Sequence, residues 1–405
     1  MEASRDFVFQ KFCEYYRDPS TVIPAPPLPE QREFGYLTFK ERFMVRHKRF
    51  AGISSLQATL RQTVPSDVYH SCAYYENPDF DMDKKGWLGA DLVFDIDADH
   101  IPSPCNKIHD EFTCSKCGFS GRGITPDACP VCEGTKFASK TWPCDQCIES
   151  AREETVKLVD FLSNDLGFSL DELHVFFSGH RGFHVHVENE AVRSLDALAR
   201  KEIVDYVIGL GIKLFEKKIK KTSDKFRLHN FGWNKRLKIG IKTFLSHASE
   251  EDFVKLGFDS GKLKLFSEKK DTLIERCLDE GYWAGVFGVG DGTWMKLAEH
   301  VRNQQVSKID TVVTTDIHRL IRMNGTLHGK TGLRKVEFPA RNLQDFDPFT
   351  GAVVFHKGEV KVEISDAPQF RMCGQTLGPF KNEAKELPVA AAVMLICKGR
   401  AKVAD

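Results

Sequence analysis

Two aspartates within an apolar segment are the first residues whose spacing suits chemistry. The stretch DLVFDIDADH, residues 91–100, surrounds Asp95 and Asp97 with the aliphatic and aromatic side chains of a buried strand. Residues two apart on a strand point to the same face, roughly 6–7 Å from each other. Two carboxylates at that spacing repel each other and raise a pKa, and a cation between them removes the conflict. The pattern favours a divalent metal site, with a strand end whose acids cap turns or face water as the alternative.

A second metal-type pattern lies in residues 101–149, which are rich in Cys, Pro and Gly. Two CxxC pairs separated by eleven residues come from Cys114, Cys117, Cys129 and Cys132. Each such turn presents two thiolates, so these four residues predict one tetrahedral Zn²⁺. A further set of three Cys and one His flanks this ribbon: Cys105, His109, Cys144 and Cys147. It predicts another structural zinc site, unless Cys105 is a free buried thiol and His109 a surface histidine.

The stretch SGHRGFHVHV, residues 178–187, gathers anion-binding side chains at a tight glycine-bounded turn. They are Ser178, His180, Arg181 and His184. Arginine forks and histidine donors suit phosphate oxygens, and the glycines allow backbone N–H groups to approach a ligand. The segment is not a P-loop, because no Lys-Ser or Lys-Thr pair follows. Buried histidines with satisfied hydrogen bonds are the alternative.

A third motif, IDTVVTTDIHRLIRMNGTLHGKTGL, places an acid next to a basic cluster in residues 309–333. Asp310 stands at the head of a β-branched segment that we expect to be a strand. The basic residues Arg322, His328 and Lys330 follow it. An acid that holds a metal beside cations that hold phosphates suits a metal–triphosphate site. A salt-bridged surface loop is the alternative.

The elements that must position these motifs alternate between strands and helices. We expect helices at 6–17, from 150 onward, at 194–225 and at 250–305, and a short one at 317–322. The helix after 150 carries the capping-box spacing of Ser150 and Glu153. Strands are expected at 33–39, 43–50, 91–97, 172–189 around the glycine turn, and 307–316. This alternation predicts an α+β protein rather than an all-α or all-β one.

Composition narrows the class of protein further. The chain has 405 residues, 41% of them hydrophobic and 28% charged, which is typical of a soluble globular protein. Its net charge is zero, so total charge does not indicate a nucleic-acid partner. The basic run 213–227 is either a solvated helix face or a DNA-facing patch. We find neither a secretory leader nor an apolar run of membrane-spanning length, and expect a cytoplasmic protein without a membrane partner.

The three motifs occur in the order DID, SGHRGFH and ID…RLIR…GTLHGKTG. This ordered set, with a Cys-rich insert directly after the first motif, closely resembles the catalytic small subunit of the archaeal and eukaryotic type of DNA primase, archaeal branch. The resemblance extends over about residues 30–335. It implies a mixed-sheet catalytic core with an inserted zinc-binding module and an inserted helical subdomain. The implied ranges are 1–100, 150–190 and 305–345 for the core, 101–149 for the zinc insert and 191–304 for the helical subdomain, with 346–405 of unknown role.

The resemblance also implies roles for individual residues. Asp95, Asp97 and Asp310 would bind two catalytic Mg²⁺ or Mn²⁺ ions, with Asp316 as the alternative third acid. The positions that match nucleotide-binding residues of the family are Ser178, His180, Arg181, His184, Arg322, His328 and Lys330, together with Glu33 and Arg46 on an N-terminal strand pair. The zinc knuckle of the family falls on Cys105, His109, Cys144 and Cys147. Because the CxxC ribbon is inserted within that knuckle, we expect one or two zinc ions.

The activity implied is synthesis of short primers on single-stranded DNA from nucleoside triphosphates, by two-metal nucleotidyl transfer. The partner implied is a primase large subunit that carries an iron–sulfur domain. Three other functions share part of the pattern: a primer-extending polymerase of the end-joining type, a two-metal nuclease, and a non-catalytic zinc-ribbon DNA-binding module. A nuclease has less use for so many triphosphate-binding cations, and intact acids argue against a non-catalytic module.

Overall fold

The computed structural model of the chain describes residues 2–213, 228, 230–280 and 290–404. It divides into two compact units. The first comprises Met1–Val159, Ser169–Lys201 and Lys308–Asp405, and the second comprises Asp160–Phe168 and Glu202–Ser307. The basic run 213–227 falls almost entirely outside the described residues, so its two interpretations stay open.

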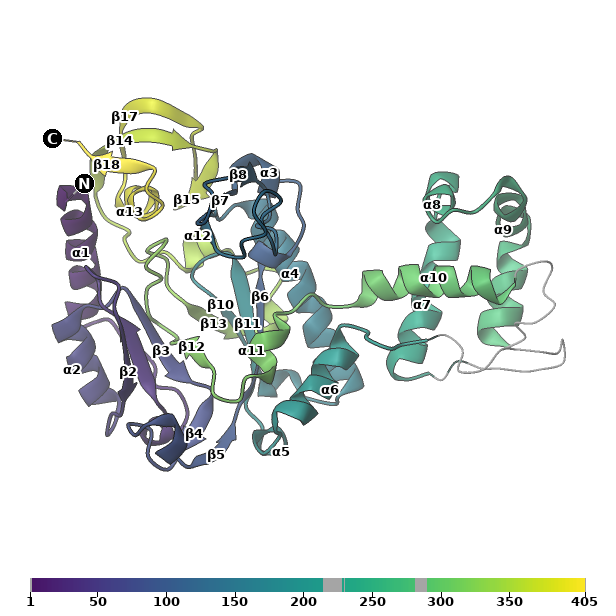
Figure 1. Cartoon of the computed structure of the whole chain (residues 1–405), viewed down its shortest axis with the longest axis horizontal. Helices are drawn as coiled ribbons and strands as arrows, with labels where there is room; N and C mark the ends of the chain where they lie inside the picture. Colours follow the sequence, from purple (N-terminus) through teal and green to yellow (C-terminus); the bar gives the residue numbers. More distant parts are fainter. Residues whose placement is uncertain (1, 214–227, 229, 281–289, 405) are drawn as a thin grey trace. The chain divides into compact units, whose positions relative to one another are not determined.

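Two four-stranded antiparallel sheets form the framework of the first unit (Figure 1). The first sheet has the order β12-β3-β1-β2, with bounds Leu320–Arg322, Asp67–Ser71, Phe34–Leu37 and Met44–Lys48. The second has the order β13-β10-β11-β6, with bounds Val336–Pro339, Leu173–Phe177, Gly182–Val187 and Leu92–Asp97. The predicted strands at 33–39, 43–50 and 91–97 and the strand–turn–strand at 172–189 are therefore confirmed.

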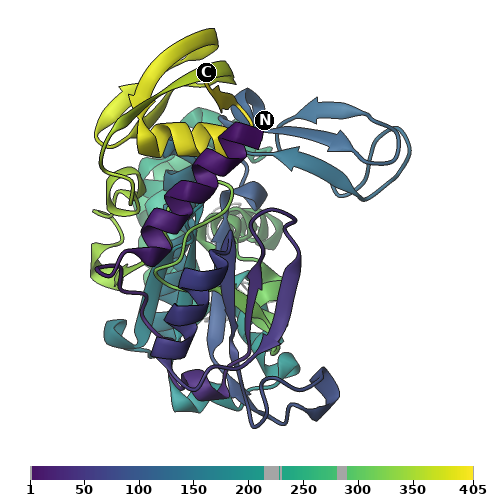
Figure 2. The same cartoon turned by 90° about the vertical axis from the view of Figure 1, so that its left-hand side faces the viewer.

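Smaller sheets complete the first unit. β4 and β5 form a two-stranded pair, Ala73–Tyr75 and Trp87–Ala90. The cysteine-rich segment forms the sheet β8-β7-β9, with bounds Ser120–Arg122, Glu111–Cys114 and Phe137–Lys140, which projects from the rest of the unit in Figure 2. The C-terminal residues form β17-β14-β18, with bounds Phe380–Pro388, Glu359–Ala367 and Ala401–Val403, and the pair β15 and β16, Phe370–Met372 and Gln375–Leu377.

Helices cover these sheets. Those of the first unit are α1 Glu2–Arg17, α2 Ile53–Thr63, α3 Asn106–His109, α4 Asp145–Asp160, α5 Glu190–Arg193, α11 Thr311–Thr315, α12 Pro348–Gly351 and α13 Val389–Cys397, with α6 Ala197–Val207 crossing the unit boundary. Figure 2 shows α1 packed against α13. None of the described helices has the length and hydropathy to cross a membrane.

Three local predictions are wrong, each because another interaction prevails. The expected strand at 307–316 is the short helix α11, because the Asp310 carboxylate accepts hydrogen bonds from the first N–H groups of the helix. The expected helix at 317–322 contains strand β12, which pairs with β3. The helix expected to start at Ser150 begins five residues earlier, at Asp145 in α4, so the capping-box signature lies inside the helix.

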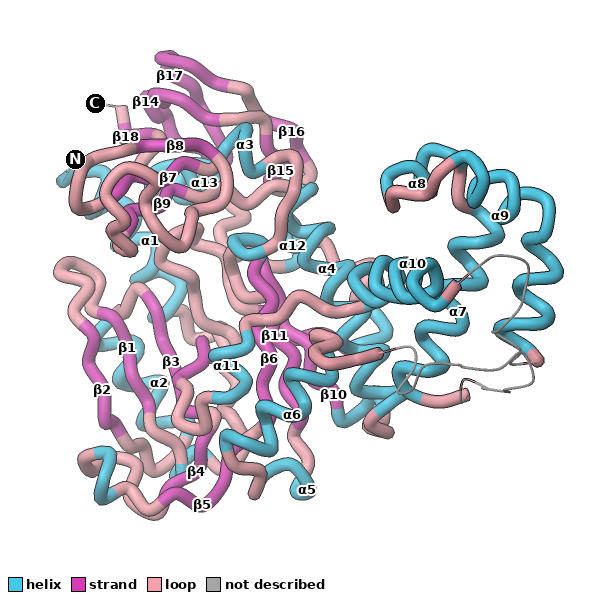
Figure 3. Tube along the Cα trace, turned by 45° about the vertical axis from the view of Figure 1, so that its right-hand side comes forward, coloured by secondary structure: helices cyan, strands magenta, loops and turns pink. Residues whose placement is uncertain are grey.

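The second unit contains only helices among its described regular elements (Figure 3). Besides most of α6 they are α7 Gly232–His247, α8 Glu250–Lys255, α9 Ser260–Leu273 and α10 Asp291–Gln305, with π-helical turns at Phe161–Asp165 and Ile274–Asp279. Its core includes the stacked rings of Phe258 and Phe266, whose centroids are 5.6 Å apart. Such aromatic packing stabilises a small helical unit beyond simple area burial.

A buried ion pair connects the two large sheets of the first unit. The side chain of Arg32 is fully buried and lies 2.6 Å from the Asp91 carboxylate. The same guanidinium donates to the carbonyl oxygens of Ser71 and Cys72, at 2.9 and 2.8 Å. Ser71 ends β3 and Asp91 precedes β6, so Arg32 fixes the end of one sheet against the start of the other. Its charge is compensated where it is buried, as such a group requires.

Gly182 allows β11 to lie against β6, and this close approach can be tested. A Cβ atom at this position would lie 2.3 Å from the carbonyl oxygen of Ile96. We expect Gly182→Ala to lower the free energy of unfolding by about 1–3 kcal/mol, because strand backbone must shift to accept the methyl group. Urea unfolding followed by circular dichroism measures this. Gly52→Ala is the matched control, since nothing lies within 4 Å of its Cβ position; equal effects of the two changes would contradict the packing argument.

Candidate active site

The register of β6 and β11 sets the geometry of the acidic residues. Across this antiparallel pair, Asp95 lies opposite His184 and Asp97 lies opposite Gly182. Nε2 of His184 is 3.4 Å from a carboxylate oxygen of Asp95. The backbone N–H of Asp310 donates to the carbonyl oxygen of Asp95 at 2.8 Å. The first and third sequence motifs therefore meet at Asp95, and the second motif faces it from the next strand.

The surroundings of the β6 carboxylates destabilise their ionised form. Burial, and then the charges of Asp97 and Asp310, raise the pKa of Asp95 to about 7. Burial and the neighbouring charge of Asp99 raise the pKa of Asp97 to about 6. Both shifts have the sign expected where like charges are held close together out of water. A divalent cation would relieve them, so these donors fit Mg²⁺ or Mn²⁺.

The side chains that converge as one ligand set differ in part from the predicted triad. In the described part of the chain, ligand atoms of Asp97, Asp99 and His180 lie within 4.8 Å of one another, and the combination Asp95, Asp97 and Asp310 does not form such a group. A carboxylate oxygen of Asp310 accepts from the Val312 N–H at 2.9 Å and so points to its own helix. Sequence reasoning did not give Asp99 a role, although it continues the same alternate spacing two residues after Asp97.

One ring nitrogen of His184 lies near the Asp95 carboxylate, and the other has no hydrogen-bond partner among the described residues. Its ring is buried, and Nδ1 has no hydrogen-bond partner among the described residues. Burial, and then the charges of Lys335 and Arg322, hold the pKa of His184 well below its usual value. The ring is therefore neutral, with one nitrogen available as a donor or an acceptor. A buried nitrogen of this kind fits a site that is completed by a ligand.

The second and third motifs form one cluster beside the acids. Thr331 donates its hydroxyl hydrogen to the carbonyl oxygen of Gly179 at 2.6 Å, which ties the two loops together. The Ser178 hydroxyl accepts from the N–H of His180 and of Gly182, both at 3.3 Å, and so holds the tight turn. The rings of His180 and His328 then stack with centroids 5.1 Å apart. These contacts align two imidazoles at the position where phosphate binding was expected.

The two basic residues of the third motif have different surroundings. Arg322 is buried and lies 2.6 Å from Asp67, a carboxylate that sequence reasoning missed. Asp67 also accepts from the N–H of Gly329 at 3.1 Å, so it fixes the loop that carries His328. Lys330 is exposed. In the part of the chain that the structure describes, a carboxylate holds Arg322 and none forms an ion pair with Lys330, so Lys330 is the more available of the two for an incoming anion.

Arg181 does not extend freely into the cluster. Its side chain is only 1% exposed, hydrogen-bonds Asp99 and lies 2.8 Å from Asp110. The adjacent His109 is hydrogen-bonded to the same Asp110 at 2.8 Å. Pairing with these two carboxylates balances the charge of Arg181 inside the protein. Arg181 connects the acidic end of β6 with the cysteine-rich segment.

The N-terminal pair predicted at Glu33 and Arg46 is an ion pair, with 3.0 Å between the guanidinium and the carboxylate. Glu33 is fully buried and also contacts Lys85 at 2.8 Å. Burial by itself would raise the pKa of Glu33, but hydrogen bonds from Arg46, Lys85 and the His47 N–H outweigh it, and the net effect is a lowered pKa. No sequence pattern indicated a role for Lys85, because its loop matches none of the three motifs.

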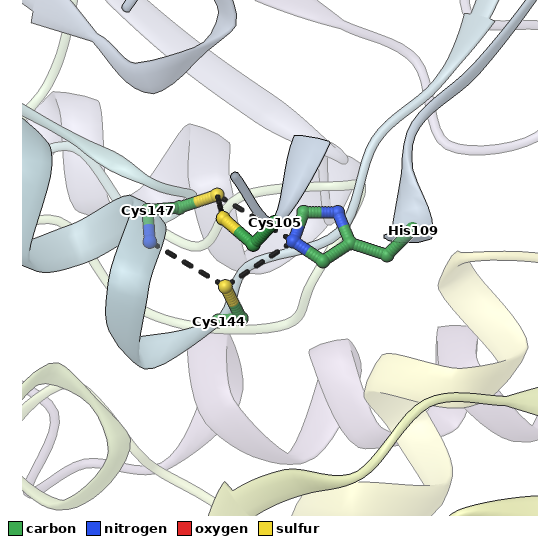
Figure 4. A group of neighbouring side chains, drawn as sticks. All are labelled: Cys105, His109, Cys144 and Cys147. Atoms are coloured by element: carbon green, nitrogen blue, oxygen red, sulfur yellow. Dashed lines mark hydrogen bonds between the residues drawn. The ribbon is translucent and has the colours of Figure 1, made fainter. Parts of the chain in front are cut away.

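The two cysteine-containing ligand sets predicted from spacing are each gathered in the structure. The ligand atoms of Cys105, His109, Cys144 and Cys147 lie within 4.8 Å of one another, and Figure 4 shows the four side chains pointing toward one another. The same is true of the set Cys114, Cys117, Cys129 and Cys132. In the first set, the hydrogen bond from His109 Nδ1 to Asp110 leaves Nε2 to face the thiols. This donor chemistry and second-sphere orientation fit tetrahedral Zn²⁺.

The raised pKa of Asp95 predicts how stability depends on pH without added Mg²⁺ or Mn²⁺. The ordinary pKa is 3.8 and the folded value is about 7. Between these values the folded state binds the proton more tightly, so stability falls as the pH rises. Asp95→Asn removes this titration, and we expect its stability relative to the unmodified protein to rise by about 1–3 kcal/mol from pH 5 to pH 8. Urea unfolding at both pH values measures the difference.

Asp345→Asn is the control for this titration, because Asp345 is exposed and lies outside the acidic group. Its stability should differ from that of the unmodified protein by a constant amount at the two pH values. Added Mg²⁺ should reduce the effect of Asp95→Asn, since bound cation keeps the carboxylate ionised. A difference for Asp95→Asn that does not change with pH would mean that the carboxylate is not destabilised in the folded protein.

The two ligand sets predict the zinc content of the purified protein. We expect His109→Ala to bind one zinc ion fewer than the unmodified protein and to unfold at a lower temperature, because metal binding contributes to folding. Mass spectrometry of the metals and a thermal unfolding curve provide the two readouts. His356→Ala is the matched control, since His356 is exposed and distant in sequence from both sets. Equal zinc content in the two variants would remove His109 from the ligands.

Comparison with known proteins agrees with this geometry. The family model for the DNA primase small subunit matches residues 132–339. The DNA primase small subunit of Nitrosopumilus maritimus is 31% identical, with all of both chains covered. That of Cenarchaeum symbiosum is 35% identical over 98% of this chain and 97% of its own, and that of Thermoplasma volcanium is 33% identical over 98% of each. On this combined evidence, the chain belongs to the DNA primase small subunit family.

Proposed function

We propose that this chain is the catalytic subunit of a DNA primase. It is a nucleotidyltransferase that synthesises short primers on single-stranded DNA from nucleoside triphosphates during replication. The observation that carries the proposal is the register of β6 with β11, which places Asp95 and Asp97 beside His184 and the histidine turn. Acids that hold a metal next to donors that hold phosphates are what phosphoryl transfer requires. Membership of the family supports the same activity.

The acidic residues provide the metal ligands of the reaction. Asp95 and Asp97 are the central ligands, and Asp310 completes the predicted triad after its side chain turns from the helix that it caps. Asp99 is the additional acid in this geometry, because its carboxylate already converges with that of Asp97. When bound, Mg²⁺ or Mn²⁺ lowers the pKa of the attacking 3′-hydroxyl and neutralises the leaving pyrophosphate. The acids also keep the reacting groups in line by fixing where the cations bind.

The histidine turn and the third motif bind the triphosphate. His180 and His328 are both buried and neutral, since burial lowers the pKa of each well below its usual value. Each can donate one N–H to a phosphate oxygen without the desolvation penalty of a buried cation. Lys330 adds charge at the exposed side, and Arg322, held by Asp67, adds it from the buried side. Glu33 and Arg46 form a further wall of the nucleotide site.

The remaining elements have supporting roles in this proposal. The two large sheets form the catalytic core, and they are antiparallel where a mixed sheet was expected. Residues 101–149 form the zinc-binding insert, and the second unit is the inserted helical subdomain. The two cysteine-containing ligand sets would each hold a structural Zn²⁺. Arg181 couples the knuckle at His109 to the acidic residues through Asp110 and Asp99. The partners are the single-stranded template, nucleoside triphosphates and a primase large subunit.

Primer synthesis without a supplied primer tests the activity directly. The protein is incubated with single-stranded DNA, labelled nucleoside triphosphates and Mg²⁺ or Mn²⁺, with and without the large subunit. Short labelled products support a primase. Extension of a supplied primer, with no product in its absence even when the large subunit is present, would favour a primer-extending polymerase of the end-joining type. No synthesis under any of these conditions would reject the proposal.

Asp95→Asn combined with Asp97→Asn is the decisive variant. We expect synthesis to fall at least about 1000-fold, because the ions that neutralise the leaving group lose their central ligands. Binding of single-stranded DNA, measured by fluorescence anisotropy, should change little. Asp345→Asn is the matched control and should retain full activity, since this exposed acid lies outside the acidic group. Undiminished synthesis by the double variant would mean that the metal ligands have been assigned wrongly.

A further inference from the structure

The C-terminal residues bring a lysine to the cluster that we assign to phosphate binding. Lys398 directly follows α13, a helix with seven buried residues. Its backbone N–H donates to the carbonyl oxygen of Met394 at 2.9 Å, which closes the last helical turn. Gly399 follows with a φ of 67°, and β18 then pairs with β14. Lys398 is therefore held between a buried helix and a paired strand, and its backbone position is fixed by the fold.

The ammonium group of Lys398 lies against the histidine turn. Its Nζ is 2.5 Å from Nε2 of His180, whose ring stacks on that of His328. The side chain is partly exposed, so a ligand can reach it. Within the described ranges, no carboxylate forms an ion pair with this ammonium, and its bonding partner is a neutral imidazole. Lys398 is thus a cation whose charge is not balanced by any direct contact.

The groups around Lys398 leave an excess of positive charge. Arg181 is balanced by Asp99 and Asp110, whereas Lys330, two residues after His328, is exposed. Burial, followed by the charges of Arg181 and Lys330, lowers the pKa of Lys398 to about 7. An anion with several charges would relieve this repulsion and accept hydrogen bonds from both histidines. The geometry therefore indicates a polyphosphate rather than a single carboxylate.

We propose that Lys398 binds the triphosphate of the incoming nucleotide, together with Lys330 and beside His180 and His328. The inference rests on the proposed function and extends it by assigning a role to residues 346–405, whose role was unknown from sequence. The C-terminal helix and strand then act as a wall of the nucleotide site. On binding, the ammonium exchanges its hydrogen bond to His180 for one to a phosphate oxygen. The His180 ring then takes the tautomer with its proton on Nε2 instead of Nδ1, so that Nε2 can donate to the ligand.

Substitution of Lys398 tests the proposal in primer extension on a template, with the nucleotide concentration varied. We expect Lys398→Ala to raise the KM for nucleoside triphosphate about 10-fold or more, and to raise the inhibition constant of pyrophosphate similarly, because one charge-assisted hydrogen bond corresponds to about a tenfold change in affinity. Lys398→Arg should recover part of the loss. Lys361→Ala is the matched control, since Lys361 is exposed on the same C-terminal sheet and lies outside the site.

A direct binding measurement separates the role of Lys398 in nucleotide binding from any role in turnover. Titration of unmodified protein and Lys398→Ala with nucleoside triphosphate and Mg²⁺ in a calorimeter should reproduce the loss of affinity without turnover. Thermal unfolding of Lys398→Ala within about one degree of the control shows that the helix is intact. An unchanged KM and nucleotide affinity, or a loss of template affinity alone, would overturn the proposal while synthesis by the unmodified protein continues. Absence of synthesis by the unmodified protein would instead reject the proposed function.

Discussion

The proximity of like charges on one buried strand is the constraint on which the site depends. Asp95 and Asp97 share strand β6. Burial and neighbouring carboxylates raise the pKa of both, and the neighbour of Asp97 in this respect is Asp99. Such a pair costs stability unless a cation is present. The apolar neighbours of the two acids and the pairing of β6 with β11 stabilise the sheet and offset this cost. A strained charge distribution of this kind is common at functional sites and is rarely useful elsewhere.

The rest of the first unit balances and orients charge around that strand. Arg32 fixes the two large sheets to each other through Asp91, so the distance from β3 to β6 is set by a buried ion pair. Asp67 holds Arg322 beside the loop that carries His328, and Arg181 holds Asp99. These charges are compensated within the protein. Among the described residues, no carboxylate forms an ion pair with Lys330 or Lys398.

The ligand set that contains His109 and the acidic group are connected through few bonds. His109 faces the thiols with one nitrogen and Asp110 with the other, and Asp110 holds Arg181. Orientation of a ligand histidine by a carboxylate is a common second-sphere arrangement. Here the Asp110 carboxylate also forms an ion pair with Arg181, which lies in the histidine turn. The knuckle therefore stabilises its own segment and also helps to place the residues at the end of β6.

The sequence by itself determined the features that depend on local spacing. A run of apolar residues predicted strand β6, glycines predicted the turn before β11, and CxxC spacing contributed to both cysteine sets, because each pattern reflects backbone geometry over a few residues. Only the tertiary structure decided that the Asp310 N–H bonds to the carbonyl oxygen of Asp95, that Arg181 pairs with carboxylates, and that Lys398 reaches His180. These outcomes join residues from distant parts of the chain. They follow from charge compensation and packing between elements, which local propensity does not encode.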